Sequence, residues 1–321
     1  MEKSSSLKSK IVFFGTPHFA AEILRYLALN DVSISGIVTQ PDRPRGRSKQ
    51  LAPSPVKEVA AELLPNIPVL QPEKASNEEF LQALFSLSAD LYVVVADGQI
   101  LSQKLLSHPS LGCINIHASL LPKYRGAAPM QRCLMNGEKE TGIAIQKMVK
   151  QLDAGDVIAT AKIEIPDEMI LGELEAQLCE VSKPLLLKVL KAFDSGVPDA
   201  VSQDHNLATY ASKIDPSEGE IFWDLPADKI HNLVRAFSPR PGAWTWLETN
   251  VKKIKVLRSN LVEDKHGTPG QLLSNDGLIA CGRGALRLIE VQPEGKKAMS
   301  WGDWFRGVSN FTHFPTLKSD R

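Results

Sequence analysis

The sequence predicts a two-domain protein: an α/β domain with a doubly wound, mostly parallel sheet, followed by a smaller β-rich domain. The chain has 321 residues, which leaves room for two domains at roughly 150 residues each. Short apolar runs alternate with helix-like periodicity as far as residue 194, a pattern typical of βαβ units. Beyond about residue 211 the pattern changes to short β-like segments separated by turns, which predicts a small barrel.

The composition is that of an ordinary globular chain, with 43% hydrophobic and 23% charged residues. Lys plus Arg equal Asp plus Glu at 37 each, so a polyanionic partner would need a local basic patch. The four cysteines form no C-x-x-C pair, which favours reduced thiols in the cytoplasm over a disulfide framework or a zinc site. The polar N-terminus lacks a signal-peptide core. No apolar run approaches ~18 residues, so no membrane span is predicted.

The chain opens with the pattern of a βαβ unit. Residues 11–14 form an apolar run that stops at Gly15, residues 19–29 have apolar side chains at helical spacing, and residues 34–39 form the next strand candidate. One glycine after the first strand is weak evidence for a phosphate site. Since no G-x-G-x-x-G follows it, we reject a dinucleotide-binding site.

A basic segment at residues 41–55 follows the second predicted strand and combines Pro and Gly with no hydrophobic periodicity. Its four cations are Arg43, Arg45, Arg47 and Lys49. The pattern predicts a mobile, positively charged surface loop suited to contacting phosphates. The alternative is a solvated connector without a specific role. The length of the segment before the helix predicted at residues 56–64 favours a function.

The alternation of strands and helices continues to residue 194. Predicted strands cover residues 69–70, 91–96, 112–117, 141–148 and 158–165, and predicted helices cover residues 77–87, 128–136 and 171–194. Ala96-Asp97-Gly98 ends one strand, where glycine permits close approach of a ligand, and Asp97 is either a ligand group or a turn residue. We place the domains at residues 1–197 and 211–321, with a linker at 198–210 because hydrophobic periodicity is lost there.

The strongest chemical signal comes from Asn115 and His117, which project from one face of a predicted strand. Asp153 follows the next predicted strand, and we expect strand carboxyl ends to gather these side chains. A carboxylate would orient the imidazole for proton transfer, and the amide would donate to an oxyanion. Since G-x-S-x-G is absent, attack by the substrate's own nucleophile is favoured. These residues alone indicate acyl transfer or hydrolysis. An Asn-x-His pair alone is more often a buried structural pair.

The C-terminal half contains a second basic cluster. Predicted strands cover residues 254–257, 270–273, 278–281 and 286–291. Lys252, Lys253, Lys255 and Arg258 lie within or directly beside the first of these predicted strands and are suited to phosphate contacts. A solvated basic edge that discourages strand pairing is an equally good interpretation.

Motifs along nearly the whole chain resemble the methionyl-tRNA formyltransferase family. They are G-T-P-H-F-A-A at 15–21, Q-P-D-R-P-R-G-R at 40–47, N-I-H-A-S-L-L-P at 115–122, R-G-A-A-P-M-Q-R at 125–132, L-D-A-G-D at 152–156, R-A-F-S-P-R-P-G-A-W at 235–244 and G-K-K-A-M at 295–299. The resemblance implies a Rossmann-like catalytic domain, a linker and an OB-like β-barrel domain that helps hold a tRNA.

The resemblance also implies roles for particular residues. The catalytic trio would be Asn115, His117 and Asp153. The folate contacts would be Ser119, Leu120, Leu121, Pro122, Ala96, Asp97 and Gly98, and the tRNA contacts Arg43, Arg45, Arg47 and Lys49. In the implied reaction, the α-amine of methionyl-initiator-tRNA attacks the formyl carbon of 10-formyltetrahydrofolate through a tetrahedral intermediate, for translation initiation in the cytoplasm. No metal, membrane or obligate protein partner is implied.

Three positions depart from the family pattern. Ala118 stands where the family commonly has Gly, Asp97 stands where it commonly has Tyr, and residues 169–172 are more apolar than usual. The carboxylate of Asp97 would lie near the expected pterin pocket, where it could accept a hydrogen bond from the pterin amino group. None of the three changes the catalytic trio.

Two alternatives stay open. One is a formyltransferase that acts on glycinamide ribonucleotide or an amino sugar; the basic loop and the C-terminal domain argue against it, because a small substrate needs neither. The other is a non-catalytic RNA-binding protein on an inherited fold. The intact trio argues against that one.

Overall fold

The chain forms two compact units. The computed structural model describes residues 8–45, 50–96, 101–248, 252–308 and 311–315. The first unit holds residues 1–127, 141–163 and 176–211, and the second unit holds residues 128–140, 164–175 and 212–321. Two short internal segments therefore group with the C-terminal part of the chain. The domain boundaries drawn from the sequence stay a prediction.

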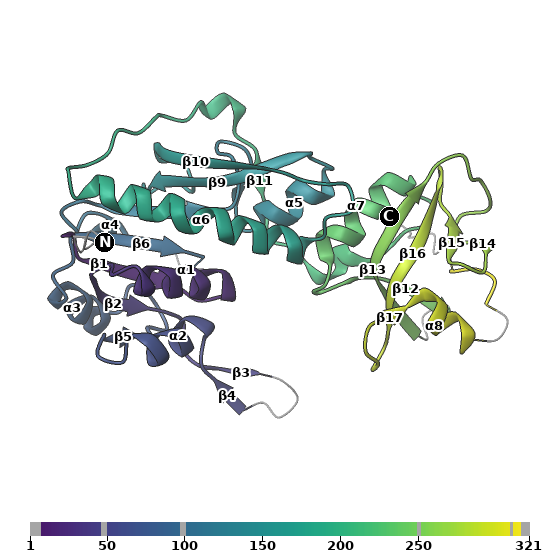
Figure 1. Ribbon diagram of the computed structural model, residues 1–321, viewed down its shortest axis with the longest axis horizontal. Helices are drawn as coiled ribbons and strands as arrows, with labels where there is room; N and C mark the ends of the chain where they lie inside the picture. Colours follow the sequence, from purple (N-terminus) through teal and green to yellow (C-terminus); the bar gives the residue numbers. More distant parts are fainter. Residues whose placement is uncertain (1–7, 46–49, 97–100, 249–251, 309–310, 316–321) are drawn as a thin grey trace, which may run out of the picture. The chain divides into compact units, whose positions relative to one another are not determined.

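Within the described residues, the first unit is built on a seven-stranded sheet (Figure 1). In spatial order the strands are β10 (Val157–Glu164), β9 (Glu140–Lys147), β7 (Cys113–His117), β6 (Leu91–Val95), β1 (Ile11–Gly15), β2 (Ile34–Val38) and β5 (Val69–Leu70). The strands from β5 to β7 pair in parallel, and β9 pairs antiparallel with β7. The chain winds outward in both directions from β1, so the predicted doubly wound, mostly parallel sheet is confirmed.

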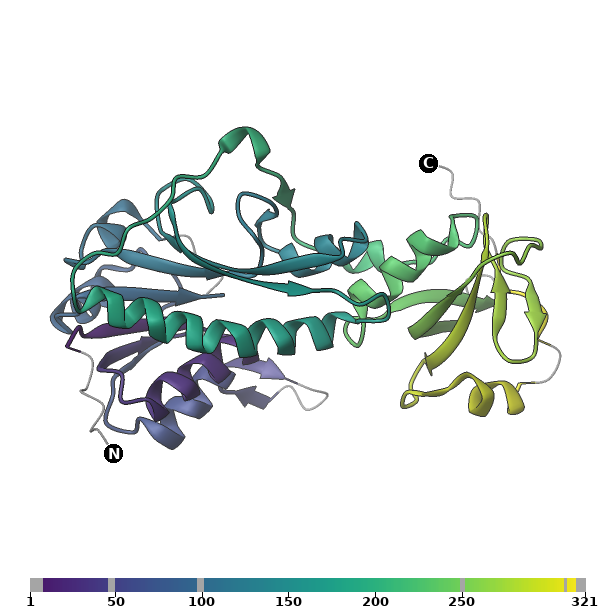
Figure 2. The same cartoon turned by 45° about the horizontal axis from the view of Figure 1, so that its top comes forward.

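Helices cover both faces of this sheet. Strand alternation sends Val12 and Phe14 to one face, where they join a buried cluster with α3 (Glu78–Ser86) and α4 (Gln103–Leu106). On the other face, α1 (His18–Leu29) and α6 (Leu171–Phe193) lie next to each other (Figures 1 and 2), and the Cys179 thiol lies 3.8 Å from the Phe19 carbonyl oxygen. Strands β1 and β6 are buried along their whole length, which explains their continuous apolar runs.

The segment predicted as a basic surface loop contains two short strands that pair as a hairpin. Strand β3 (Arg43–Arg45) pairs antiparallel with β4 (Gln50–Ala52). Just before β3, the Asp42 carboxylate accepts hydrogen bonds from Lys57 Nζ at 2.8 Å and from Gln71 Nε2 at 2.8 Å. The hydrogen bond from Lys57 holds the pKa of Asp42 below its ordinary value. Because Lys57 belongs to α2 (Pro55–Leu63), this contact anchors the base of the hairpin.

The segment predicted as a linker folds onto the first unit instead of running free. It runs from the end of α6 past β10 (Figure 2), where Val201 forms a bridge with Val157. It continues through the 3₁₀ helix η1 (His205–Leu207) to β11 (Tyr210–Ala211), which pairs in parallel with β8 (Arg125–Gly126). This segment therefore reaches the loop that follows β7.

The second unit contains an antiparallel sheet with the order β12-β13-β16-β15-β14, and β17 lies beside β16. The strands are β12 (Ala243–Glu248), β13 (Lys252–Val262), β14 (Leu272–Ser274), β15 (Leu278–Ala280), β16 (Ala285–Pro293) and β17 (Met299–Ser300). The helices are α5 (Pro129–Met135), the 3₁₀ helix η2 (Pro216–Gly219), α7 (Ala227–Phe237) and α8 (Trp301–Arg306). The predicted strands overlap β13 to β16, and the predicted class of a smaller β domain is confirmed. Helices α7 and α8 and strand β12 lie outside the predicted elements.

Aromatic side chains fill the core of the second unit. The Trp223 and Phe314 rings stack with their centroids 5.1 Å apart, and both side chains are buried. The Trp223 indole donates to Thr245 Oγ1 at 3.1 Å, so its polar edge is satisfied inside the core. Across the part of the chain that the structure describes, no helix is long and apolar enough to cross a membrane.

Two leucines of α1 provide a matched test of the first core. Leu24 is fully buried, whereas Leu29 is 68% exposed. We expect Leu24→Ala to lower the free energy of unfolding by about 2–5 kcal/mol, because it leaves a cavity. Leu29→Ala should change this free energy by less than about 0.5 kcal/mol. Urea unfolding followed by circular dichroism measures both, and equal midpoints for the two variants would contradict the assignment of Leu24 to the core.

Candidate active site

Asn115 and His117 lie on one face at the carboxyl end of β7. Cys113, earlier on the same face, packs in the apolar cluster under α3 and α4, so a single strand passes from the core to a polar end. Asn115 is paired across the sheet with Val94 of β6 and with Gln146 of β9. The His117 side chain is buried, with 6% of its surface exposed. A rigid central strand therefore carries both side chains.

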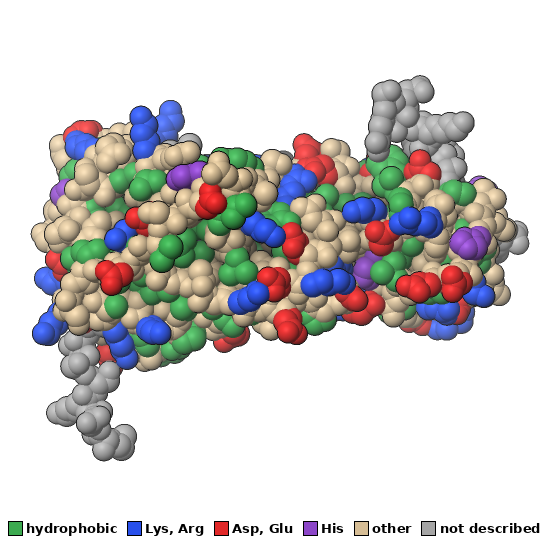
Figure 3. Space-filling view, turned by 90° about the horizontal axis from the view of Figure 1, so that it is seen from above, with side chains coloured by type: hydrophobic (Ala, Val, Ile, Leu, Met, Phe, Trp, Pro, Cys, Tyr) green, Lys and Arg blue, Asp and Glu red, His purple; other side chains and the backbone are tan. Residues whose placement is uncertain are grey.

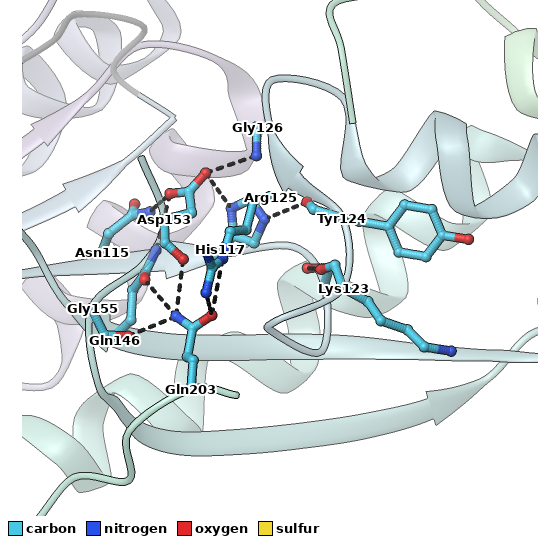
Figure 4. Close-up of polar contacts among 11 residues, drawn as sticks. Asn115, His117, Lys123, Tyr124, Arg125, Gly126, Gln146, Asp153, Gly155 and Gln203 are labelled. Carbon is cyan, nitrogen blue, oxygen red and sulfur yellow. Dashed lines mark hydrogen bonds and ion pairs between the residues drawn. The ribbon is translucent and has the colours of Figure 1, made fainter. Parts of the chain in front are cut away.

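The Asp153 carboxylate is the centre on which the polar side chains converge (Figure 4). Its Oδ2 accepts from the Gly126 backbone N–H at 2.8 Å, and its Oδ1 accepts from Gln146 Nε2 at 3.0 Å and from Asn115 Nδ2 at 3.4 Å. His117 Nδ1 lies 3.8 Å from Oδ2. The structure therefore brings together the three residues that the sequence singled out.

The prediction that Asp153 lies at the carboxyl end of a strand parallel to β7 is wrong. We expected its strand to run parallel to β7, but β9 is antiparallel, and Lys147 at its carboxyl end lies opposite Ile114, near the start of β7. Residues 148–156 turn back instead, since Lys147 N–H donates to the Asp156 carbonyl oxygen at 2.9 Å. Asp153 has a φ of +46° in this turn, a conformation that Asp tolerates better than most residues.

The hydrogen bonds of His117 distinguish its two ring nitrogens. Nε2 lies 2.9 Å from the Tyr124 carbonyl oxygen. Because a carbonyl can only accept, Nε2 carries a hydrogen in this contact. Nδ1 is left facing Asp153 at a separation longer than a hydrogen bond. A proton taken up at Nδ1 would therefore lie next to a carboxylate.

The predicted folate-contacting residues lie in two places. Ser119 is fully buried, and its hydroxyl donates to the Lys123 carbonyl oxygen at 2.6 Å, which closes a tight loop after β7. Leu120, Leu121 and Pro122 are half-buried along this loop. Ala96 is exposed at the carboxyl end of β6 with a φ of +47°, and the predicted contacts Asp97 and Gly98 lie outside the described residues. Ala118 is not among the positive-φ residues, so alanine fits where the family commonly has glycine.

Only part of the predicted tRNA-binding set can be placed. The exposed Arg43 guanidinium forms an ion pair with the Glu73 carboxylate at 2.8 Å. Arg45 ends β3, and Arg47 and Lys49 lie outside the described residues. In Figure 3, Lys and Arg side chains are interspersed with Asp and Glu side chains on the visible face. The charge on that face is therefore mixed, in keeping with a net charge of zero.

The second basic cluster lies on β13 and is partly occupied by other contacts. Lys253 Nζ lies over the indole rings of Trp244 and Trp246, at 3.7 and 4.6 Å from their centroids. Arg258 forms ion pairs with Glu173 and, at 3.8 Å, with Glu290. Lys252 and Lys253 also line a cavity of about 650 Å³ in the second unit, together with Lys296, Trp304 and Phe311.

The chemistry of Cys113 argues against a protein nucleophile near the trio. Burial raises the pKa of its thiol to about 12, so the thiolate is scarce at neutral pH. All four cysteines are free and buried. In the described part of the chain, no group of three or more His, Cys, Asp or Glu side chains is arranged to hold a metal ion.

Sequence reasoning missed the residues that support the trio. Gln146 is buried with 2% of its surface exposed, Arg125 with 1% and Gln203 with 8%. Gln146 lies on a strand whose residues 141–146 are all buried, and its place opposite Asn115 depends on a strand pairing that the sequence does not mark. Gln203 had no local signal, since it lies in a segment without hydrophobic periodicity.

Comparisons of the chain with known proteins agree with this geometry. Residues 9–190 match the formyl transferase family, and residues 213–309 match the formyl transferase C-terminal domain. A methionyl-tRNA formyltransferase of Protochlamydia amoebophila is 47% identical, with 94% of this chain and 96% of that protein aligned. Those of Chlamydia caviae and Staphylococcus epidermidis are 41% and 43% identical, over 95% and 94% of this chain and 97% and 96% of theirs.

Solved structures of similar fold have much lower sequence identity. An N-formyltransferase from Helicobacter canadensis, in complex with folinic acid and dTDP-3-aminofucose, aligns with a TM-score of 0.67 at 16% identity, over 89% of this chain and 99% of that one. HypX from Aquifex aeolicus, in complex with tetrahydrofolic acid, aligns with a TM-score of 0.62 at 16% identity, over 93% of this chain and 47% of that one. At such identities the likeness shows the fold alone.

The chain therefore belongs to the formyl transferase family and, within it, to the methionyl-tRNA formyltransferases. The resemblance and the enzyme class predicted from the sequence are confirmed. The roles of individual site residues stay predictions.

The contact between Gln146 and Asp153 gives a prediction for pH dependence. Gln146→Glu places a second carboxylate where the amide now donates to Asp153 at 3.0 Å. Two carboxylates so close cannot both ionise freely, so one of them keeps a proton to higher pH than an isolated carboxyl group. That proton restores the hydrogen bond, and we expect the ratio of variant to wild-type activity to be higher at pH 6 than at pH 8.5. Steady-state rates at the two pH values measure the ratio, and a ratio independent of pH would contradict the contact.

Proposed function

We propose that this chain transfers the formyl group of 10-formyltetrahydrofolate to the α-amine of methionyl-initiator-tRNA, for translation initiation in the cytoplasm. The observation that carries this proposal is the convergence of Asn115, His117 and Gly126 on Asp153 at the end of β7. Identities of 47% and 41% to methionyl-tRNA formyltransferases over nearly the whole chain support the choice of substrate. The buried, free state of the four cysteines agrees with a reducing compartment.

The amine attacks the formyl carbon directly in this proposal. A new C–N bond forms, negative charge develops on the formyl oxygen, and the bond to N10 of the folate then breaks. Asn115 supplies an oxyanion donor, because its amide has two N–H groups and only one of them faces Asp153. The high pKa of the Cys113 thiol supports direct attack over a covalent acyl-enzyme.

His117 moves the proton that this reaction requires. The attacking amine must lose a proton, and N10 of the folate must gain one as it leaves. Since Nε2 of His117 is engaged with the Tyr124 carbonyl oxygen, Nδ1 is the nitrogen that accepts and returns the proton. Asp153 orients the ring and stabilises the imidazolium. The separation of 3.8 Å is expected to shorten when substrate binds.

The formyl donor would bind where the carboxyl ends of β6 and β7 meet. Half-buried Leu120, Leu121 and Pro122 offer an apolar wall after β7, and exposed Ala96 lies at the end of β6. Open α/β sheets bind ligands at such strand ends, beside the point where the winding reverses. A tetrahydrofolate-derived donor also agrees with the folates bound in the structural neighbours.

A formyltransferase for an amino sugar is the nearest alternative. Several structural neighbours are described as sugar N-formyltransferases, but their identities to this chain are 17–19%. The basic hairpin and the family's C-terminal domain, matched at residues 213–309, favour a large polyanionic acceptor. Assaying transfer to charged initiator tRNA, charged elongator tRNA and a dTDP-amino sugar side by side discriminates the two. Transfer only to the sugar would contradict the proposal that methionyl-initiator-tRNA is the acceptor.

The role of His117 is tested by removing its imidazole. We expect His117→Ala to lower kcat by about 10²–10⁴-fold, since both the proton carrier and its orientation are lost. The melting temperature of His117→Ala should stay above the assay temperature, so that rates are measured on folded protein. His266→Ala is the matched control, because His266 is exposed in the second unit. Undiminished transfer by His117→Ala would contradict the proposed proton route.

Arg47 tests the predicted phosphate contacts of the basic segment. We expect Arg47→Ala to raise the KM for tRNA. The slope of log KM against log salt concentration should fall by about 0.7–0.9, which is the contribution of one phosphate contact. The KM for the folate should not change. Rates across a salt series measure both slopes, and an unchanged tRNA KM and slope would remove Arg47 from the tRNA interface.

A further inference from the structure

We propose that Gln203 is a positioning residue for formyl transfer. It fixes the positions of His117 and Asp153 relative to each other, through the backbone segments that contact them. This inference rests on the proposed function. Gln203 comes from the segment between α6 and β11 and is 8% exposed. It touches none of the reacting atoms in the proposed mechanism, so it acts through other residues.

The carboxamide of Gln203 uses both of its ends. Its Oε1 accepts from the Arg125 guanidinium, at 3.1 Å from Nε and 2.7 Å from Nη2. Its Nε2 donates to the carbonyl oxygens of Asp153 at 2.9 Å and Gly155 at 2.7 Å. A carboxamide offers two donors and two acceptor positions, and here all four have partners.

The donor end of Gln203 holds the turn that carries Asp153. Asp153 has a φ of +46°, a conformation that persists in a non-glycine residue only when its surroundings hold it. The two carbonyls that Gln203 binds belong to Asp153 and Gly155, on both sides of Ala154. A Cβ atom at Gly155 would lie 1.7 Å from the Lys147 carbonyl oxygen, so the turn also has no room to shift toward β9.

The acceptor end of Gln203 holds the loop that contacts both catalytic side chains. Arg125 is 1% exposed, and its Nη2 also lies 3.0 Å from His205 Nδ1. Its neighbour Tyr124 accepts from His117 Nε2, and its other neighbour Gly126 donates to Asp153 Oδ2. Figure 4 shows Gln203 between Arg125 and the Asp153 turn. One side chain therefore links the backbone that orients the imidazole to the backbone that carries its carboxylate.

A buried, fully bonded glutamine also contributes to stability, so the test must separate the two roles. Gln203→Glu does this, because a carboxylate keeps the contact with Arg125 but presents an oxygen, not an N–H, to the Asp153 and Gly155 carbonyls. We expect kcat to fall by about 10-fold or more, with both KM values within about twofold of wild type. A side chain that only stabilises the fold would leave the kcat of the folded enzyme unchanged, so a fall in kcat at unchanged KM is a result that a purely structural role would not give.

Two further variants make the result decisive. Gln151→Glu adds the same charge near the same turn from an exposed position, and should leave kcat and both KM values unchanged. Gln203→Asn keeps the amide but shortens its reach, and should reproduce the loss of kcat if Gln203→Glu does not fold. Folding of each variant is checked by its melting temperature before rates are compared.

The outcomes separate this inference from the proposed function. Wild-type protein without formyl transfer would refute the function itself. Wild-type transfer together with an unchanged kcat in a folded Gln203 variant would overturn the positioning role. Failure of both Gln203 variants to fold would also overturn it, because the side chain would then act through stability alone.

Discussion

The site is organised by the hydrogen bonding of one carboxylate in a polar, mostly buried setting. Asp153 accepts from Gly126, Gln146 and Asn115, which belong to β8, β9 and β7. An ionised carboxyl group is an acceptor only, so each of these donors has one sensible orientation. The position of Asp153 therefore sets the direction of the Asn115 amide and the place of the carboxylate beside His117. Since the turn of Asp153 is a sparsely populated conformation, the surrounding contacts must hold it.

The sheet supplies the rigidity that these contacts need. Cys113, Asn115 and His117 share one face of β7, and the first of them is packed in the apolar cluster with Phe14 and Tyr92. The polar end of the strand is thus fixed by the packed core behind it. The antiparallel pairing of β9 then puts Gln146 directly opposite Asn115. In this register the two amides are neighbours across the sheet, and both donate to Asp153.

Several side chains of the two basic segments have acidic or aromatic partners. Asp42 and Lys57 fix the base of the β3–β4 hairpin, while Arg43 is paired with Glu73. On β13, Arg258 is paired with Glu173 and Lys253 lies on two indole rings. Exposed ion pairs of this kind contribute little to stability, so their cations can exchange an acidic partner for a phosphate at small cost. The phosphate contacts proposed for these residues would therefore not require a broad positive field on a neutral chain.

The sequence by itself determined the fold class and the three central residues. Continuous apolar runs at β1 and β6 marked buried strands, and Asn115, His117 and Asp153 stood in motifs that resemble those of a known family. The sequence did not predict that β9 is antiparallel, since alternation marks a strand without its direction. It also did not predict Gln203, because the segment around it lacks periodicity and is ordered by hydrogen bonds to residues 48–78 positions away. Such partners exist only after the chain has folded, so tertiary structure alone decided how the trio is held.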